Sequence, residues 1–274
     1  GGEETQYEML KRLQLDYRDF PKLKGYCDRK GIIFLSTPHT FDAIDFLEDM
    51  VPSYKFGSGD LTNIPALEHA ASKGKPMMLG TGMSTLSEVR EAVGVIRKQG
   101  NDRIVALHCT TDYPCPPEDV NLRAMKTMMR ELDCLVGYSD HTLGIIVPVA
   151  AASLGSTVIE KHFTLDKSMQ GPDHKASLEP DELREMVGSI RAVETILGSG
   201  EKRPTESEKA IMGIVRKSIA SSCDIPKGTT ITSDMLAVKR PGTGIPPKDI
   251  NKVVGKKAKK TIKCDHMIRP GDVG

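Results

Sequence analysis

A regular alternation of short apolar strands and amphipathic helices limits the fold of this chain more than any other feature. Apolar, β-branched runs begin at intervals of roughly 20 to 30 residues, the period of a strand–helix unit. Such a repeat predicts a parallel sheet covered by helices. The six expected strands are residues 31–37, 54–58, 76–81, 104–110, 135–139 and 157–163.

The segments between these strands have the spacing of helices, most clearly in residues 85–99 and 180–197. Apolar residues recur there at intervals of three or four, which puts them on one face of a helix. Pro180 and the two acidic residues after it favour a helix start, and Gly198 favours a helix end. We therefore expect a helix in each segment.

Small or reactive residues stand at the carboxyl end of nearly every predicted strand. An open doubly wound sheet, which six strands could also form, would concentrate such residues at one crevice. A barrel collects them all on one face, so we favour a (β/α)8 TIM barrel whose first two strands are missing. The chain opens with a loop and a helix, and we expect it to be truncated at its N-terminus. The strand-end residues are Ser36, Thr37, Lys55, Ser58, Thr81, Thr110, Thr111, Ser139, Asp140, His141 and His162.

The residue pattern of the sequence changes after residue 200. We assign residues 1–200 to the barrel, 201–214 to a charged linker, and 215–274 to a small β-rich domain with weak helical periodicity. The stretch 239–263 holds nine Lys or Arg residues against one acidic residue. Such a run is usually a solvated face, and the alternative is a patch that attracts an anionic substrate.

Composition excludes several classes of protein. The chain has 38 basic and 37 acidic residues and a net charge of +1, without the basic excess of a nucleic-acid binder. No apolar run approaches the roughly 20 residues that span a bilayer. The six cysteines form no C-x-x-C pair, so they indicate neither a zinc knuckle nor a disulfide framework. Reduced thiols and the absence of a signal segment lead us to expect a cytoplasmic protein.

Two histidines follow consecutive predicted strands, His141 in a Ser-Asp-His-Thr run and His162 in a Glu-Lys-His-Phe run. A single histidine at such a place is more often structural. Consecutive strand ends are neighbours in a barrel, so the two imidazoles together could share one metal ion with open positions for water and substrate. Mn²⁺ or Mg²⁺ would suit a phosphate-bearing substrate.

Lys55 offers a positive charge beside the flexible Gly57-Ser58-Gly59 segment, whose backbone could approach a phosphate closely. A structural alternative is a strand lysine whose ammonium reaches solvent. A different chemical alternative is a Schiff-base lysine, for which Lys161 is a second candidate.

Two loops could present further polar groups on the same face. Gly171-Pro172 predicts a turn that presents Asp173, although a plain helix-entry loop explains the segment equally well. Thr111 and Tyr113 stand in a proline-shaped loop, and either could contact a substrate hydroxyl.

Taken together, these pieces resemble the bacterial sialic acid synthases, including the legionaminate and pseudaminate enzymes. The resemblance covers essentially the whole chain, and the small C-terminal domain is similar to the antifreeze-like (SAF) domain of these synthases. The runs that carry it are YKFGSGD, LGTGMS, HCTTDYPCP, GYSDHT, IEKHFT, GPDHKASLEP, RKSIA and KRPGTGI.

The resemblance implies a barrel with an antifreeze-like domain and a condensation of phosphoenolpyruvate with an open-chain N-acetylated hexosamine. The products would be a nine-carbon α-keto acid and phosphate. It implies a divalent metal, Mn²⁺ or Mg²⁺, and a homodimer in which this domain caps the partner's barrel. No nucleic acid or membrane partner is expected.

The resemblance also assigns roles to residues. It implies that His141 and His162 bind the metal, and we expect catalytic roles for these two and for Lys55 and Asp173. The arginines of the R-K-S and K-R-P-G runs are Arg216 and Arg240, expected near the substrate. The phosphoenolpyruvate contacts fall on Thr37, Lys55, Ser58, Thr111 and Ser139, and the sugar contacts on Asp60, Tyr113 and Asp173.

The chain departs from the family pattern at one end. The glutamate that the family carries on its first strand and the lysine on its second strand have no counterpart here. We therefore expect this chain alone to be inactive or poorly folded. Two other functions stay open, a non-catalytic carbohydrate-binding remnant of a synthase and a Schiff-base aldolase. The sequence does not choose the sugar acceptor.

Overall fold

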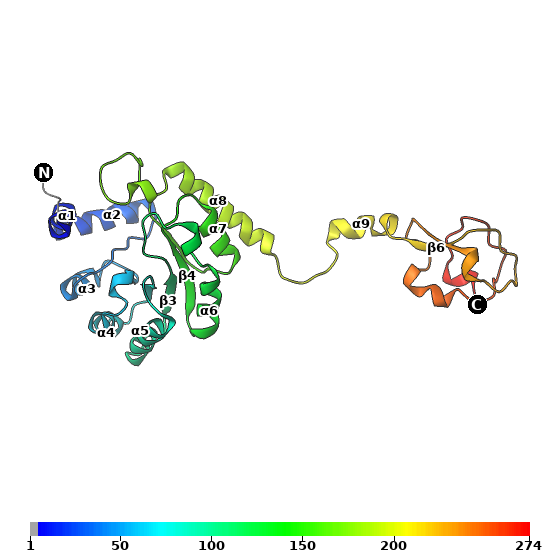
Figure 1. Ribbon diagram of the computed structural model, residues 1–274, viewed down its shortest axis with the longest axis horizontal. Coiled ribbons are helices and arrows are strands. Elements are labelled where there is room, and N and C mark those ends of the chain that lie inside the picture. Colours follow the sequence, from blue (N-terminus) through cyan, green and yellow to red (C-terminus); the bar gives the residue numbers. More distant parts are fainter. Residues whose placement is uncertain (1–4) are drawn as a thin grey trace. The chain divides into compact units, whose positions relative to one another are not determined.

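The computed structural model describes residues 5–274 (Figure 1). Contacts divide the chain into two compact units, Gly1–Gly198 and Ser199–Gly274. The first unit is an α/β structure, and the second is small and contains two strands. None of the helices in the described part of the chain is long and apolar enough to cross a membrane.

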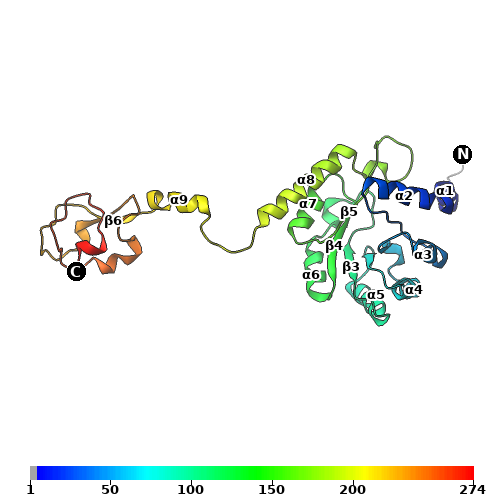
Figure 2. The same ribbon diagram turned by 180° about the vertical axis from the view of Figure 1, so that it is seen from behind.

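Five parallel strands form the sheet of the first unit, in the order β1-β2-β3-β4-β5. Each of the first four strands is followed by a helix, and helices α3 to α6 lie around the outside of the strands (Figures 1 and 2). The strands are β1 (Tyr54–Phe56), β2 (Met77–Gly80), β3 (Ile104–His108), β4 (Leu135–Asp140) and β5 (Ile159–Lys161). The helices are α1 (Gln6–Leu13), α2 (Phe20–Lys30), α3 (Phe41–Leu47), α4 (Ile64–Ser72), α5 (Leu86–Lys98), α6 (Arg123–Glu131), α7 (Ile146–Ser153) and α8 (Pro180–Leu197).

The core lies between the sheet and these helices. Helix α5 turns its predicted apolar face inward, where Val89, Val93 and Ile96 are buried. Its first turn is fixed by a capping box in which the side chain of Thr85 and that of Glu88 each accept a backbone N–H. The helices predicted in 85–99 and 180–197 are both confirmed.

The prediction of a strand at 31–37 is wrong. The segment after α2 has no strand pairing, and Ile32 and Ile33 are 62% and 71% exposed. An apolar, β-branched run forms a strand only when a neighbour satisfies its backbone groups. The first unit is thus a curled five-stranded parallel sheet, and an eight-stranded closed barrel is not formed by residues 5–274.

The second unit is built around a small apolar core. Helix α9 (Glu206–Val215) overlaps most of the segment predicted as a linker and ends one residue beyond it. Strands β6 (Ser218–Ser221) and β7 (Leu236–Lys239) pair antiparallel. Backbone pairs such as Ile225 with Ile262 join the irregular loops. The core consists of Ile219, Ile225, Ile231, Ile245, Val253, Ala258, Ile262, Ile268 and Val273.

Candidate active site

Two imidazoles meet at the carboxyl ends of β4 and β5. The ring centroids of His141 and His162 are 5.3 Å apart. The ring of Tyr113 lies against both, at 4.1 Å from His141 and 5.4 Å from His162. Asp173 approaches from the following loop, with Oδ2 3.9 Å from Nδ1 of His162. The structure thus brings together four residues that the sequence assigned to the metal and the sugar.

The orientation of His141 suits a metal ligand. Its Nδ1 lies 2.6 Å from the carbonyl oxygen of Thr110, an acceptor that fixes the proton on Nδ1 and leaves Nε2 for a cation. Burial lowers the pKa of this imidazole below its ordinary 6.5, while the Thr110 carbonyl acts in the opposite direction. A neutral ring is the form that binds a metal.

The donor set near these rings fits a divalent cation with open positions. No group of three His, Cys, Asp or Glu side chains among residues 5–274 could enclose a metal ion by itself. Two imidazoles would leave several positions to water or substrate, as a catalytic metal requires.

A second cluster joins the two outer strands of the sheet, β1 and β5. Lys55 Nζ on β1 lies 3.3 Å from Oε1 of Glu160 on β5. The same carboxylate oxygen accepts a 2.7 Å hydrogen bond from Oγ of Ser139 on β4. Glu160 was not among the predicted site residues. Since side chains alternate along a strand, its position two residues before His162 could have revealed it.

A third cluster surrounds the backbone of Gly82, just after β2. The Gly82 N–H points at Ser58 Oγ (3.0 Å) and Cys109 Sγ (3.1 Å). A Cβ on Gly82 would lie 2.9 Å from Ser58 Oγ and closer still to Thr111 Oγ1. Only glycine therefore lets these two predicted phosphoenolpyruvate contacts converge.

Two other predicted residues of the first unit, Asp60 and Thr37, form no hydrogen bond or ion pair with these clusters among residues 5–274. Asp60 is paired with His39, whose Nδ1 lies 3.3 Å from Asp60 Oδ2. Thr37 is half-buried in the segment before α3. Among residues 5–274, no hydrogen bond or ion pair joins Thr37 to another predicted site residue.

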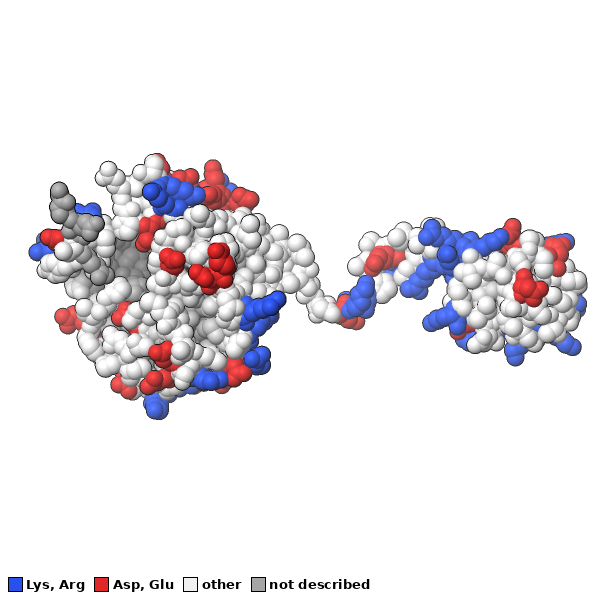
Figure 3. All heavy atoms as spheres, viewed as in Figure 1, with Lys and Arg blue, Asp and Glu red and all other residues white. Residues whose placement is uncertain are grey.

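Arg216 and Arg240 belong to the second unit, and both are exposed. Their segments touch, because the N–H of Gly242 donates to the carbonyl of Gly213 at 2.8 Å. A Cβ on Gly242 would lie 2.7 Å from the Cβ of Arg216. Lys and Arg side chains stand at several places around this unit, with the largest group near α9 and β6 (Figure 3).

Lys161 is a poor candidate for a Schiff base. Its ammonium is 2.6 Å from Asp140 Oδ2, and the two side chains are 2% and 0% exposed. A buried ammonium held by a carboxylate cannot reach a substrate carbonyl.

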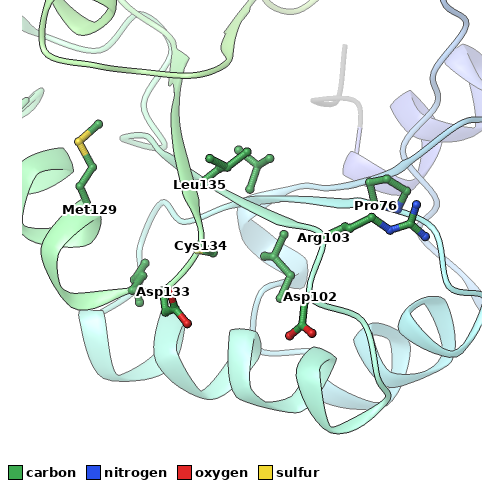
Figure 4. A pocket seen from close by; sticks show the side chains of 10 residues that line it. Pro76, Asp102, Arg103, Met129, Asp133, Cys134 and Leu135 are labelled. Atoms are coloured by element: carbon green, nitrogen blue, oxygen red, sulfur yellow. The ribbon is translucent and has the colours of Figure 1, made fainter.

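A separate hollow lies at the opposite ends of the strands (Figure 4). Its lining residues precede or begin β2, β3 and β4 and include Pro76, Arg103 and Leu135. Its charged groups are engaged by neighbours: Arg97 lies 3.5 Å from Asp102 and from Asp133. The hollow contains none of the predicted site residues, so the candidate active site is the set of clusters at the carboxyl ends of the strands.

Comparison with known proteins identifies the family. The sequence model of the NeuB family matches residues 1–202, and that of the SAF domain matches residues 216–274. The chain belongs to the NeuB family. This result confirms the resemblance drawn from the motifs, including the antifreeze-like domain at the C-terminus.

Relatives within the family are named as acid synthases. The N,N'-diacetyllegionaminic acid synthase of Legionella pneumophila is 49% identical over 92% of this chain and 72% of its own length. The human N-acetylneuraminate-9-phosphate synthase is 40% identical over 96% of this chain and 74% of its own length. This NeuB-family chain is accordingly an enzyme of the synthase type.

A solved structure supports the same grouping. The N-acetylneuraminic acid synthetase of Leptospira borgpetersenii, determined with citrate, is 34% identical with a TM-score of 0.71. The match covers 74% of this chain and 71% of that one.

Proposed function

We propose that this chain condenses phosphoenolpyruvate with an open-chain N-acetylated hexosamine to give a nine-carbon α-keto acid and inorganic phosphate. N-acetylmannosamine and a 2,4-diacetamido relative are the two candidate acceptors. The observation that carries the proposal is the meeting of a lysine, a carboxylate and two histidines at one end of the sheet, in a chain whose relatives are sialic and legionaminic acid synthases.

Lys55 and the hydroxyl groups around Gly82 would hold phosphoenolpyruvate. The ammonium of Lys55 supplies charge for the phosphate or carboxylate, and Glu160 fixes that ammonium and the Ser139 hydroxyl toward the same space. Ser58 and Thr111 approach from the neighbouring strands. Binding both substrates in fixed orientation would make their reaction effectively unimolecular.

The acceptor sugar would lie beside the histidines. Tyr113 offers a ring face and a hydroxyl there, and Asp173 offers a carboxylate. Asp60 would contact the sugar from the other side of the strand ends. Arg216 and Arg240 of the SAF domain would complete the substrate contacts, in a homodimer where each domain caps the partner's sheet.

His141 and His162 would hold Mn²⁺ or Mg²⁺. A bound divalent ion would polarise the sugar aldehyde for attack by C3 of phosphoenolpyruvate. The aldehyde oxygen would take up a proton, water would add to C2, and the bond from C2 to the phosphate oxygen would then break to release phosphate and leave the keto group. The Thr110 carbonyl keeps His141 in the tautomer that binds through Nε2. We propose that the curled sheet forms part of a closed (β/α)8 barrel.

Phosphate release from phosphoenolpyruvate tests this function. Because the chain alone is expected to be inactive, the assay uses the chain with the first two barrel strands of a relative joined to its N-terminus. Each sugar is offered separately with Mn²⁺, and the His162→Ala variant serves as the control. Release with one sugar, lost in the variant, is the expected result. Covalent trapping of pyruvate on Lys55 by borohydride, without metal dependence, would instead establish a Schiff-base aldolase.

A further inference from the structure

A buried ion pair lies between the two strands that carry the histidines. Lys161 Nζ is 2.6 Å from Asp140 Oδ2, and neither side chain is more than 2% exposed. The β4–β5 register pairs Asp140 with Lys161, directly after Ser139 with Glu160. Because side chains alternate along a strand, this ion pair faces away from the active site.

The same two side chains hold the backbone on the far side of His141. Asp140 Oδ1 accepts hydrogen bonds from the N–H (3.1 Å) and hydroxyl (2.9 Å) of Thr142. Lys161 also donates to the carbonyl of Thr142. The residues on both sides of His141 are therefore tied to β5, which ends just before His162.

The ion pair also opposes slippage of the strands. Continuing the observed register by one residue sets His141 opposite His162, whose ring centroids are 5.3 Å apart. A shift of one residue would part Asp140 from Lys161 and leave two buried charges without partners. Separating a buried pair is far more costly than removing it. The alternative register is thus strongly disfavoured.

We propose that Lys161 is a positioning residue, which with Asp140 locks the register of β4 and β5 so that His141 and His162 converge on one cation. The inference rests on the proposed function only in taking the two histidines as metal ligands. Under this proposal Lys161 contributes to metal binding without contacting the substrate.

The test is Mn²⁺ binding to the full chain, measured by calorimetry for the parent and the Lys161→Met variant. We expect the variant to bind Mn²⁺ about 10- to 100-fold more weakly, the range seen when groups that orient metal ligands are removed. Raising the Mn²⁺ concentration should restore phosphate release, since the ligands themselves are unchanged.

Lys73→Met is the matched control. Lys73 also bridges carboxylates, those of Asp45 and Glu48, but it joins α3 to α4 away from the site. The Lys73→Met substitution should leave Mn²⁺ affinity unchanged. Free energies of unfolding, measured for both variants, separate a general loss of stability from a loss of positioning.

Parent-like Mn²⁺ affinity in folded Lys161→Met would overturn the proposal. If that variant does not fold, the double variant Asp140→Asn with Lys161→Met removes both charges while keeping an acceptor for Thr142. Weaker Mn²⁺ binding by the double variant would support the proposal, and parent-like binding would overturn it. A parent protein that carries the first two barrel strands of a relative, binds Mn²⁺ and yet releases no phosphate would refute the proposed function and leave this inference intact.

Discussion

Lys55 on β1 and Glu160 on β5 are in contact, Nζ to Oε1 at 3.3 Å, although three strands separate them in the sheet. An open, flat sheet would hold its two outer strands far apart, since neighbouring strands are about 4.8 Å apart. The contact therefore shows that the sheet is curled strongly enough for its carboxyl ends to share one space.

Replacing Lys55 by methionine should abolish the charge that the site offers to phosphoenolpyruvate. Hydrogen bonds to charged groups contribute about 1.5–3 kcal/mol, which corresponds to roughly a 10- to 100-fold loss of kcat/KM. Initial rates of phosphate release measure this loss of kcat/KM. Lys75→Met is the control. Lys75 stands just before β2, at the end of that strand opposite the site, and its ammonium donates to the carbonyl of Val51. Equal rates for both variants would contradict a substrate role for Lys55.

Alanine at position 82 should damage the site without unfolding the chain. The added methyl group would push against Ser58 Oγ and Thr111 Oγ1, so we expect at least tenfold slower phosphate release. Gly94→Ala in α5 is the comparison, since nothing lies within 4 Å of the added carbon. That change should stabilise the helix by about 0.5–1 kcal/mol. Parent-like activity of Gly82→Ala would show that the cluster does not bind substrate.

Two substitutions of Tyr113 separate its ring from its hydroxyl. Phenylalanine keeps the tilted ring contact with His141, whose centroid lies 4.1 Å away, whereas alanine removes it. Aromatic pairs contribute about 0.5–1.5 kcal/mol, so alanine should cost up to about tenfold in activity beyond the effect of phenylalanine. The KM for the sugar, measured in both variants, reports the hydroxyl contact. An unchanged KM in Tyr113→Phe would remove that contact from the proposal.

The SAF domain should lose stability in acid through Asp272. Burial by itself raises the pKa of this carboxyl, but Lys260, the Arg269 N–H and His266 outweigh burial and lower the pKa below its ordinary 3.8. The stabilisation is therefore complete above about pH 4 and is lost as the pH falls through the depressed value.

Asp272→Asn tests this carboxyl at neutral pH. We expect it to destabilise the second unit by about 2 kcal/mol, the contribution of hydrogen bonds to a charged group. It should also flatten the acid dependence. Hydrogen exchange of the β6 amides, followed from pH 3 to 7, measures both effects. An acid transition identical to that of the parent would assign the effect to another group.

The sequence predicted elements well where one short pattern determined them. Five of the six strands were predicted from apolar, β-branched runs, and the helices at 85–99 and 180–197 from apolar residues spaced three or four apart. The 31–37 run failed because a strand depends on its neighbours as well as on its own composition. Helix α9 was missed although Thr205 and Glu208 form a capping box, a signal present in the sequence.

The site could be predicted only in part. Motifs identified His141 and His162 as a pair, and their rings do meet. Glu160 and Lys161 stood in the same motif, yet their different tasks depend on which face of β5 each side chain occupies. Contacts such as Lys55 with Glu160 depend on how far the sheet curls, which no local pattern encodes.

The curl of the sheet has a consequence for the order of folding. Lys55 and Glu160 come from the first and last strands of the sheet, so their contact forms only after every intervening strand has paired. Contacts between residues far apart in sequence are slow to form because a long loop must close first. A nascent or partly unfolded chain would therefore hold its helices and strand pairs without any catalytic competence. Activity would appear in one step, as the last event in assembly of the unit.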